Sequence, residues 1–409
     1  MAEYIMDPKK IEQLRLRLRK DSDIGIHGIL NSQAVRYHEE ENDKDYSDIR
    51  PPFFRDADRI VHSKAYARYI DKTQVFFDII NANITHRSLH VVLVSRIAEQ
   101  IGRVLKLNVD LCHSIALAHD IGHSPYGHVG EEILDKISQK YNLAKFMHNA
   151  QSIRWLAYLE KRFPTKPAKG LNLTLQTLDG VLCHDGEINE KELKPKKING
   201  KTWKDHFKEY EDCFNENKIK RIPMSYEGIA VRFADSISYI GRDIEDAILL
   251  KFIKRKEIPE NCKNVLGDTN RKIINTLIMD LLTFSLDNDT IGYSEEIFEA
   301  LKALKRFNYE KIYDRRDLFT NKNSQTSFKE ELAKKFVLIF EISLKDLENE
   351  NNNSPIFKDH IEYIDDAKYS TYYNPLKKSN KLSLIVRDYI AGMSDKYFME
   401  VYEQYRKRT

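Results

Sequence analysis

The 409-residue sequence contains only four cysteines, and they lie far apart. No two of them form a Cys-x-x-Cys pair, so the sequence has neither the spacing of a zinc-thiolate site nor the framework of a disulfide-stapled protein. We therefore expect a protein of the reducing cytoplasm. No apolar run approaches the roughly 18 residues that a membrane-spanning helix needs. The polar segment MAEYIMDPKK at the start lacks the apolar core of a signal peptide. The sequence thus predicts no membrane partner.

An excess of charge of one sign is also missing, because the formal net charge is only +3. Such a balance does not indicate nucleic-acid binding by the whole protein. Local basic clusters exist, but runs of this kind are usually solvated helix faces, so a nucleic-acid partner stays open without being indicated. The clusters are Arg15, Arg17, Arg19 and Lys20, and then Lys194, Lys196 and Lys197.

Helical periodicity dominates the apolar residues. It predicts helices over residues 84–105, 109–120 and 225–250, where apolar side chains recur mostly at four-residue steps. Alternating runs typical of strands are few and short. The sequence therefore predicts an all-α protein.

The predicted domain organisation follows composition along the chain. Residues 1–50 form an N-terminal extension, 51–315 a catalytic core, and 316–409 a C-terminal helical region. A charged stretch near residues 185–208 is expected to be a loop or insertion within the core.

The segment ALAHDIGHSPYGHVGEEILD, residues 116–135, concentrates chemically active side chains. His119 and Asp120 are adjacent near the end of an apolar helix, where an imidazole and a carboxylate can bind one divalent ion. His123, His128 and Glu131 follow within 11 residues. Buried polar groups need partners, so this concentration indicates a functional site rather than a structural core.

Further metal ligands must come from elsewhere in the chain. His86 and His90 lie four residues apart in one predicted helix, so they share a face, and spacing alone does not choose between them. Downstream, Asp235, Tyr239 and Asp243 also recur at four-residue steps on one helix face. Asp235 directly follows an apolar run, which favours its burial.

Longer sequence motifs indicate which family of metal-dependent proteins the chain resembles. The order His, then His-Asp, then a distant Asp is the signature of the HD superfamily. The chain resembles the bacterial dGTPase family and its vertebrate relative, the SAM- and HD-domain dNTPase, from about residue 55 to 397. The words that carry the resemblance are RDADRIVHSKAY (55–66), KTQVF (72–76), TH (85–86), AHDIGHSPYGHVGEE (118–132), HNAQS (148–152), GLNLT (170–174), ADSISY (234–239) and DYIAGMSDKY (388–397).

The resemblance implies an HD-domain helical core with additional C-terminal helices, and one divalent metal ion per subunit. His86, His119, Asp120 and Asp235 match the four metal ligands of the family. His90 matches no ligand and is assigned to packing or to the surroundings of the ligands. This donor set does not distinguish among Mn, Mg, Fe, Co and Zn.

The resemblance also implies the catalytic residues. His123, His128 and His148 match the histidines around the phosphates, and Glu131 matches the acid that pairs with a catalytic histidine. We expect His128 to protonate the 5′ oxygen, and His148 with Glu131 to position or activate water. The two histidine roles could be exchanged, because the sequence gives no distances.

Six residues match substrate-binding positions: Gln74, Val75, Tyr239, Asp243, Lys305 and Tyr313. By this resemblance, Tyr239 lies beneath C2′ of the sugar and leaves no room for a hydroxyl group. One position departs from the family. Relatives often carry an arginine three residues before the first metal histidine, where this chain has Asn83, so Arg87 or Lys72 would have to supply the phosphate-side charge.

The implied reaction is hydrolysis of a dNTP, either dGTP or a broader set, to a deoxynucleoside and inorganic triphosphate. Family members usually form homo-oligomers, often with an allosteric nucleotide at subunit interfaces. One alternative is an HD phosphohydrolase for a nucleoside monophosphate, a guanosine alarmone or a cyclic dinucleotide, although the GYP word of the last group is absent. The other is a non-catalytic nucleotide sensor, against which the intact ligands and histidines argue.

Overall fold

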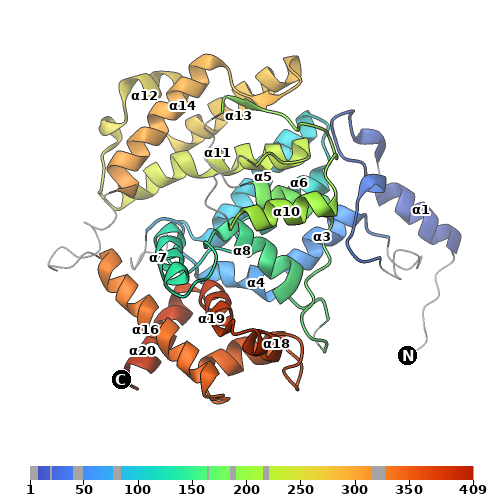
Figure 1. Ribbon diagram of the computed structural model, residues 1–409. Coiled ribbons are helices and arrows are strands. Elements are labelled where there is room, and N and C mark those ends of the chain that lie inside the picture. The colour runs from blue at the N-terminus through green and yellow to red at the C-terminus, as the bar shows by residue number, and fades with distance from the viewer. Residues whose placement is uncertain are drawn as a thin grey trace.

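The computed structural model describes residues 8–18, 21–39, 49–76, 84–163, 165–184, 190–214, 221–314 and 328–408. Helices dominate these ranges (Figure 1), and the strands within them are β1 (Glu192–Leu193) and β2 (Ile291–Gly292), which pair antiparallel. The prediction of an all-α fold is therefore confirmed. None of the helices in these ranges is long and apolar enough to cross a membrane.

Three helices form the centre of the molecule: α5 (Arg87–Val104), α6 (Val109–Ala118) and α11 (Tyr226–Leu249). Each agrees with a predicted helix to within a few residues. α11 packs against both α5 and α6, and its apolar stripe, including Ile229 and Phe233, is fully buried. The Ser225 side chain caps α11 by accepting the backbone N–H of Gly228 at 3.1 Å.

Two groups of helices flank this centre (Figure 1). In the view of the figure, α12 (Glu260–Leu266), α13 (Asn270–Asp287) and α14 (Glu295–Asn308) lie above α11, and α14 continues into the π-helix η6 (Tyr309–Tyr313). Below lie α7 (Gly127–Lys140), α16 (Phe328–Glu348), η7 (Ile356–Ile361), α17 (Glu362–Ile364), α18 (Tyr373–Lys378), α19 (Leu382–Ala391) and α20 (Asp395–Arg406).

Shorter elements complete the chain. On the N-terminal side these are α1 (Pro8–Leu18), η1 (Asp21–Asp23), η2 (Asn31–Gln33), α3 (Pro52–Val61), α4 (Lys64–Ala67) and η3 (Arg68–Asp71). In the middle they are α8 (His148–Arg154), the π-helix η4 (Trp155–Leu159), α9 (Leu175–Cys183), α10 (Trp203–Asp212) and η5 (Arg255–Glu257).

The charged stretch near 185–208 differs in part from the predicted loop. Residues 185–189 lie outside the described ranges, but β1 and the first residues of α10 fall within the stretch. α10 begins there because Thr202 and Asp205 form a capping box, in which each side chain bonds the backbone N–H of the other. The predicted boundary at residues 315 and 316 lies outside the described residues, so the three-part domain organisation stays a prediction.

A tight connection between α6 and α7 delivers the motif residues to the centre. Gly122 lets this connection lie directly on α8, because a Cβ at this position would lie 2.1 Å from the backbone oxygen of His148. Tyr126 and Gly127 then adopt left-handed backbone conformations, with φ of 62° and 53°, that turn the chain into α7. His123 and His128 thereby lie next to His148, the first residue of α8.

Candidate active site

Four side chains from three helical segments converge near the centre of the molecule. His90 lies on α5, His119 and Asp120 follow α6, and Asp235 lies on α11. His90 Nε2 is 3.1 Å from Asp235 Oδ1 and 3.7 Å from Asp120 Oδ2. His119 Nε2 is 3.5 Å from Asp120 Oδ1 and 3.8 Å from Asp235 Oδ1. Ligand atoms about 2.1 Å from a common ion lie roughly 3.0 to 3.4 Å apart. The four donors are therefore close to the spacing of a metal site.

The hydrogen bonding of His119 also suits a metal ligand. Its Nδ1–H donates to the backbone oxygen of Ala116 at 2.7 Å, which leaves the lone pair on Nε2. This Nε2 is buried and accepts no hydrogen bond from the described residues. An imidazole fixed through one nitrogen, with the other nitrogen directed at carboxylates, is how proteins present a metal ligand. The residues present therefore fit a divalent ion.

The structure separates the two candidate histidines at the start of α5. His86 is exposed and lies outside this cluster, whereas His90 is buried within it. The spacing predicted that the two histidines share a helix face, and the resemblance assigned the ligand to His86. His86 is instead the N-cap of α5 and has an extended backbone, with φ −94° and ψ 158°, so it does not share the helix face of His90. The arginine three residues before the cluster histidine is consequently Arg87. Asn83, which seemed to replace that arginine, lies outside the described residues.

Arg87 points into the cluster and forms a buried ion pair with Asp120. Burial alone would raise the pKa of Asp120, but the neighbouring His119 and Arg87 outweigh burial and hold that pKa well below its ordinary value. Lys72 behaves differently, since its ammonium donates to the backbone oxygens of His123 and Ala391. Burial, with the charges of Arg68 and Arg87, lowers the pKa of Lys72 to about 7. Lys72 therefore holds the active-site loop in place, while Arg87 faces the cavity.

The predicted catalytic residues form a second cluster beside the first. Ligand atoms of His123, His128, Glu131 and His148 all lie within 4.8 Å of one another. His128 Nδ1 is 3.1 Å from Glu131 Oε2, and His148 Nδ1 is 3.0 Å from Glu131 Oε1, so one carboxylate accepts N–H bonds from two imidazoles. The rings of His123 and His148 stack with their centroids 4.0 Å apart. His128 is the exposed member of the group.

One carboxyl group and one imidazole in this cluster, those of Glu131 and His123, have pKa values far from their ordinary values. Burial would raise the pKa of Glu131, but His148 and His128 outweigh burial and lower it well below its ordinary value. Burial lowers the pKa of His123 well below its ordinary value, and the charges of Arg87 and His148 lower it further. Glu131 is therefore an anion and His123 a neutral imidazole over the neutral pH range.

His184, at the end of α9, is a member of the site that the sequence reasoning missed. Its Nε2 lies 3.3 Å from His148 Nε2 and 3.8 Å from Asp120 Oδ1. Its Nδ1–H donates to the backbone oxygen of Val181 at 2.6 Å, as the Nδ1–H of His119 does to Ala116. A signal was present in the sequence, because VLCHD at residues 181–185 repeats the arrangement of LAHD, in which a buried apolar helix ends at a His-Asp pair.

A cavity of about 700 Å³ opens onto both clusters. Five of the six predicted substrate-binding residues line it: Gln74, Val75, Tyr239, Asp243 and Tyr313. The Tyr313 hydroxyl donates to Asp243 Oδ2 at 2.6 Å. Lys305 is not among the lining residues, since it is buried on α14. The structure thus gathers the sugar-side candidates around one space and leaves the predicted phosphate-side lysine out of it.

Comparisons with known proteins agree with this geometry. The HD-domain family model matches residues 87–240, a range that begins at Arg87 and contains His90, His119, Asp120 and Asp235. A deoxyguanosinetriphosphate triphosphohydrolase-like protein of Caldanaerobacter subterraneus is 34% identical over 357 residues, covering 87% of this chain and 85% of the relative. Proteins of the same description from Clostridium tetani and Rickettsia felis are 32% and 30% identical, and cover 86% and 87% of this chain and 84% and 91% of the relatives. The chain therefore belongs to the HD superfamily and, within it, to the dGTP triphosphohydrolase-like family.

Proposed function

We propose that this protein is a metal-dependent triphosphohydrolase that converts a dNTP, either dGTP or a broader set, to a deoxynucleoside and inorganic triphosphate. The observation that carries the proposal is the shared cavity. It is lined by His90, Asp120 and Asp235 of the first cluster and by Glu131, whose carboxylate accepts hydrogen bonds from two further imidazoles. The first group suits phosphate activation, and the second suits proton transfer.

The proposed metal ligands are His90, His119, Asp120 and Asp235. A divalent ion bound there would polarise the α-phosphate and lower the pKa of a coordinated water. Arg87, which enters the cavity beside Asp120, and Lys145, which also lines it, are cations that could bind phosphate oxygens as their charge grows.

The paired histidines divide the proton transfers. His148 donates its Nδ1–H to Glu131, so its Nε2 is the atom that can accept a proton from the attacking water. The water oxygen bonds to the α-phosphorus and the bond to the 5′ oxygen breaks. A protonated His128, which is held by the same carboxylate, supplies the proton to the 5′ oxygen. Water and dNTP thus give a deoxynucleoside and triphosphate, and the opposite assignment of the two histidines balances equally well.

His184 supports a variant of this scheme. Asp120, His148 and His184 form a second donor group whose ligand atoms lie within 4.8 Å of one another. In this variant a second ion binds there, and His148 is a ligand instead of a base. The number of ions per chain in the wild type and in His184→Ala, measured by plasma mass spectrometry, separates the two schemes. A fall from two to one supports the variant, and one ion in both proteins supports the acid-base role.

Selection for deoxyribose is assigned to Tyr239. It lies four residues after Asp235 on α11, so its ring lies on the same helix face as the proposed ligand and borders the same cavity. A sugar whose phosphate is held at the ion would lie against this ring. Tyr313 and Asp243 form the adjoining wall.

The deciding experiment is product analysis with the metal-loaded protein and the four dNTPs, given singly and mixed. A deoxynucleoside with intact triphosphate supports attack at the α-phosphorus. Turnover only in mixtures supports the predicted allosteric nucleotide, and light scattering of the same samples tests the predicted homo-oligomer. If the products were a deoxynucleoside monophosphate and pyrophosphate, the protein would instead belong to another class of phosphohydrolase. No turnover with any dNTP and metal would favour the nucleotide sensor.

A further inference from the structure

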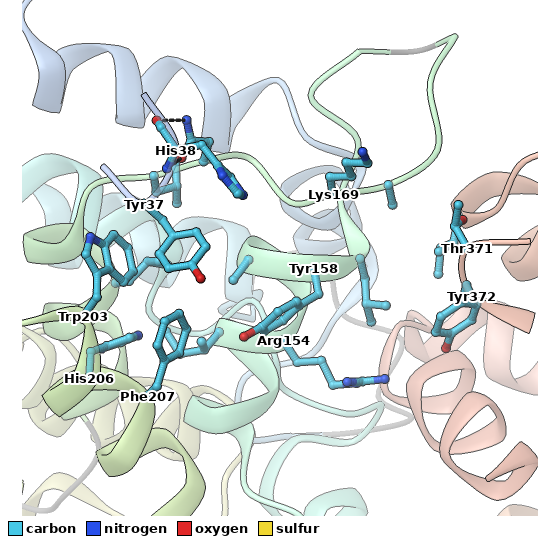
Figure 2. A pocket seen from close by; sticks show the side chains of 18 of the residues that line it. Tyr37, His38, Arg154, Tyr158, Lys169, Trp203, His206, Phe207, Thr371 and Tyr372 are labelled. Carbon is cyan, nitrogen blue, oxygen red and sulfur yellow. Dashed lines mark hydrogen bonds between the residues drawn. The ribbon is translucent and has the colours of Figure 1, made fainter. Parts of the chain in front are cut away.

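A second cavity, of about 540 Å³, lies between the N-terminal segment, η4, α10 and the C-terminal helices. Figure 2 shows Tyr37, Trp203, His206 and Phe207 gathered at one end, and Tyr158 closer to the middle. The Tyr37 ring meets Trp203 and Phe207 edge to face, with centroids 5.3 and 5.4 Å apart. We call this space the aromatic cavity. It shares no lining residue with the active-site cavity.

Two buried polar groups in its wall have no hydrogen-bond partner among the described residues. Both ring nitrogens of His206, whose residue is 0% exposed, are unbonded, and so is Nε1 of Trp203. Burial lowers the pKa of His206 to about 4, so its ring is neutral and offers one donor and one acceptor. Buried polar groups in native proteins are nearly always bonded, so groups left open at a cavity wall point to a molecule that satisfies them.

The position of His206 is fixed by its helix. Lys201, just before α10, donates to Asp179 on α9 and to Glu209 on α10, both at 2.7 Å. The capping box of Thr202 and Asp205 fixes the first turn. The first turn of α10, which carries His206, is therefore anchored against α9.

The charges around the cavity have one sign. No aspartate or glutamate is found among its described lining residues, whereas Arg154, Lys169 and His38 are. Arg154 is already neutralised by a two-point ion pair with Asp388, with nitrogen–oxygen distances of 2.6 and 2.5 Å. Lys169 is exposed at the cavity and is the cation that remains for a ligand. The wall therefore favours a molecule with an apolar body and a negative charge.

We propose that the aromatic cavity binds a planar heteroaromatic ring that carries a negatively charged substituent. The ring lies against the aromatic side chains, its heteroatoms bond His206 and the Trp203 indole N–H, and its charge lies near Lys169. A nucleoside monophosphate and a heteroaromatic carboxylate share this chemistry. The experiment below distinguishes the two sources.

Trp203 provides a local signal, because the chain has only two tryptophans. In a Trp155→Phe background, Trp203 emission is titrated with GMP, AMP and quinoline-2-carboxylate. Guanosine serves as the neutral control and 2-naphthoate as the control without a ring nitrogen. We expect saturable quenching of Trp203 emission by either the nucleotides or quinoline-2-carboxylate, and the probe that quenches shows which of the two kinds of ligand the cavity binds. Both controls should bind more weakly.

Two variants link the signal to the proposed contacts. His206→Leu keeps the side-chain volume and removes both nitrogens, so affinity should fall about 2- to 10-fold, as for a lost neutral hydrogen bond. Lys169→Ala changes an exposed residue and should reduce the preference for the anion over its neutral control by about 2- to 5-fold. The proposal is overturned if no probe quenches Trp203 at millimolar concentration, if the controls bind as tightly as the probes, or if His206→Leu binds with unchanged affinity. Circular dichroism confirms that each variant is folded.

Discussion

Several charged side chains that line the active-site cavity are bonded to one another, whereas the ring nitrogens of His206 and Trp203 in the wall of the aromatic cavity have no partner among the described residues. Glu131 accepts hydrogen bonds from His128 and His148, and Asp120 pairs with Arg87. In contrast, both nitrogens of His206 are buried and unbonded among the described residues. The pKa values follow this difference. Charged neighbours lower the pKa of the buried acids in the active site, while burial itself lowers the pKa of His206.

The two cavities therefore suit different tasks. Groups that already hold one another in charged pairs are positioned for chemistry before a substrate arrives. Unbonded neutral groups are positioned to gain hydrogen bonds from a molecule that enters the cavity. One helix touches both regions, because α8 begins at His148 and ends at Arg154, which lines the aromatic cavity.

The largest expected effect is at the metal ligands. His90→Ala removes a ligand from the buried cluster, so the protein should lose bound metal and at least the roughly 10²- to 10³-fold in turnover that one preorganised charge-stabilising group provides. His86→Ala is the matched control four residues earlier. His86 is exposed and its side chain makes no capping bond, so metal content and turnover should stay at the wild-type level. Metal analysis and product assays on both variants check this pair. The reverse pattern would restore His86 as the ligand.

The shared carboxylate gives the next effect. Glu131→Gln keeps one acceptor oxygen but removes the negative charge that both histidines contact, so turnover should fall roughly 10²-fold, the lower end for a lost acid-base group. Metal content should not change, because Glu131 is not in the ligand cluster. Glu131→Asp retains the charge and should recover part of the activity. If Glu131→Gln lost as much metal as His90→Ala, the two clusters would act as one site.

The fold and most of the site follow from local sequence rules. The helices α5, α6 and α11 were predictable because their apolar residues repeat with helical periodicity. The apolar runs before His119, Asp120 and Asp235 drew attention to these residues, but their proposed role as ligands came from the resemblance to a family. The burial of His90 in the cluster and the exposure of His86 were not predictable, because they depend on which residue begins α5. Helix boundaries are the least certain part of a sequence reading.

His184 and the aromatic cavity were missed for a different reason. His184 joins the site through the packing of α9 against α8 and α11. The lining residues of the aromatic cavity come from segments between residues 37 and 384. Such long-range proximity has no local periodicity, so the sequence shows the residues without showing that they meet.

A buried acid outside both cavities tests the role of charge pairing. Glu227 on α11 accepts the backbone N–H groups of Ile29 and Asn108 at 2.8 and 2.9 Å, but no cation faces it among the described residues. Burial therefore raises the pKa of Glu227 from 4.5 to about 7. The folded state binds a proton more tightly than the unfolded state, so this stabilisation is complete below about pH 4.5 and is lost as the pH rises through about 7.

The expected size of this effect is about 3 kcal/mol. Glu227→Gln mimics the protonated acid, so its free energy of unfolding should depend less on pH between about pH 4.5 and pH 7 than that of the wild type. The exposed Glu296→Gln is the control and should keep the wild-type slope. Denaturant unfolding at pH 5 and pH 8 measures both. Parallel curves for wild type and Glu227→Gln would show that Glu227 does not take up a proton on folding.

The smallest effect concerns the substrate wall of the active-site cavity, where bonded groups should act by positioning. Tyr313→Phe removes the hydroxyl that donates to Asp243 at 2.6 Å but keeps the ring, so Asp243 loses a partner while the wall keeps its shape. If this wall holds the sugar, KM for the dNTP should rise about 2- to 10-fold, as for one hydrogen bond, with kcat nearly unchanged. Tyr309→Phe, one turn earlier, changes a ring that also lines the cavity but whose hydroxyl makes no hydrogen bond to the described residues, so KM should change less than twofold. A fall in kcat at constant KM would instead place Tyr313 among the groups that act on the transition state, so the contrast between the variants separates substrate positioning from chemistry within one cavity.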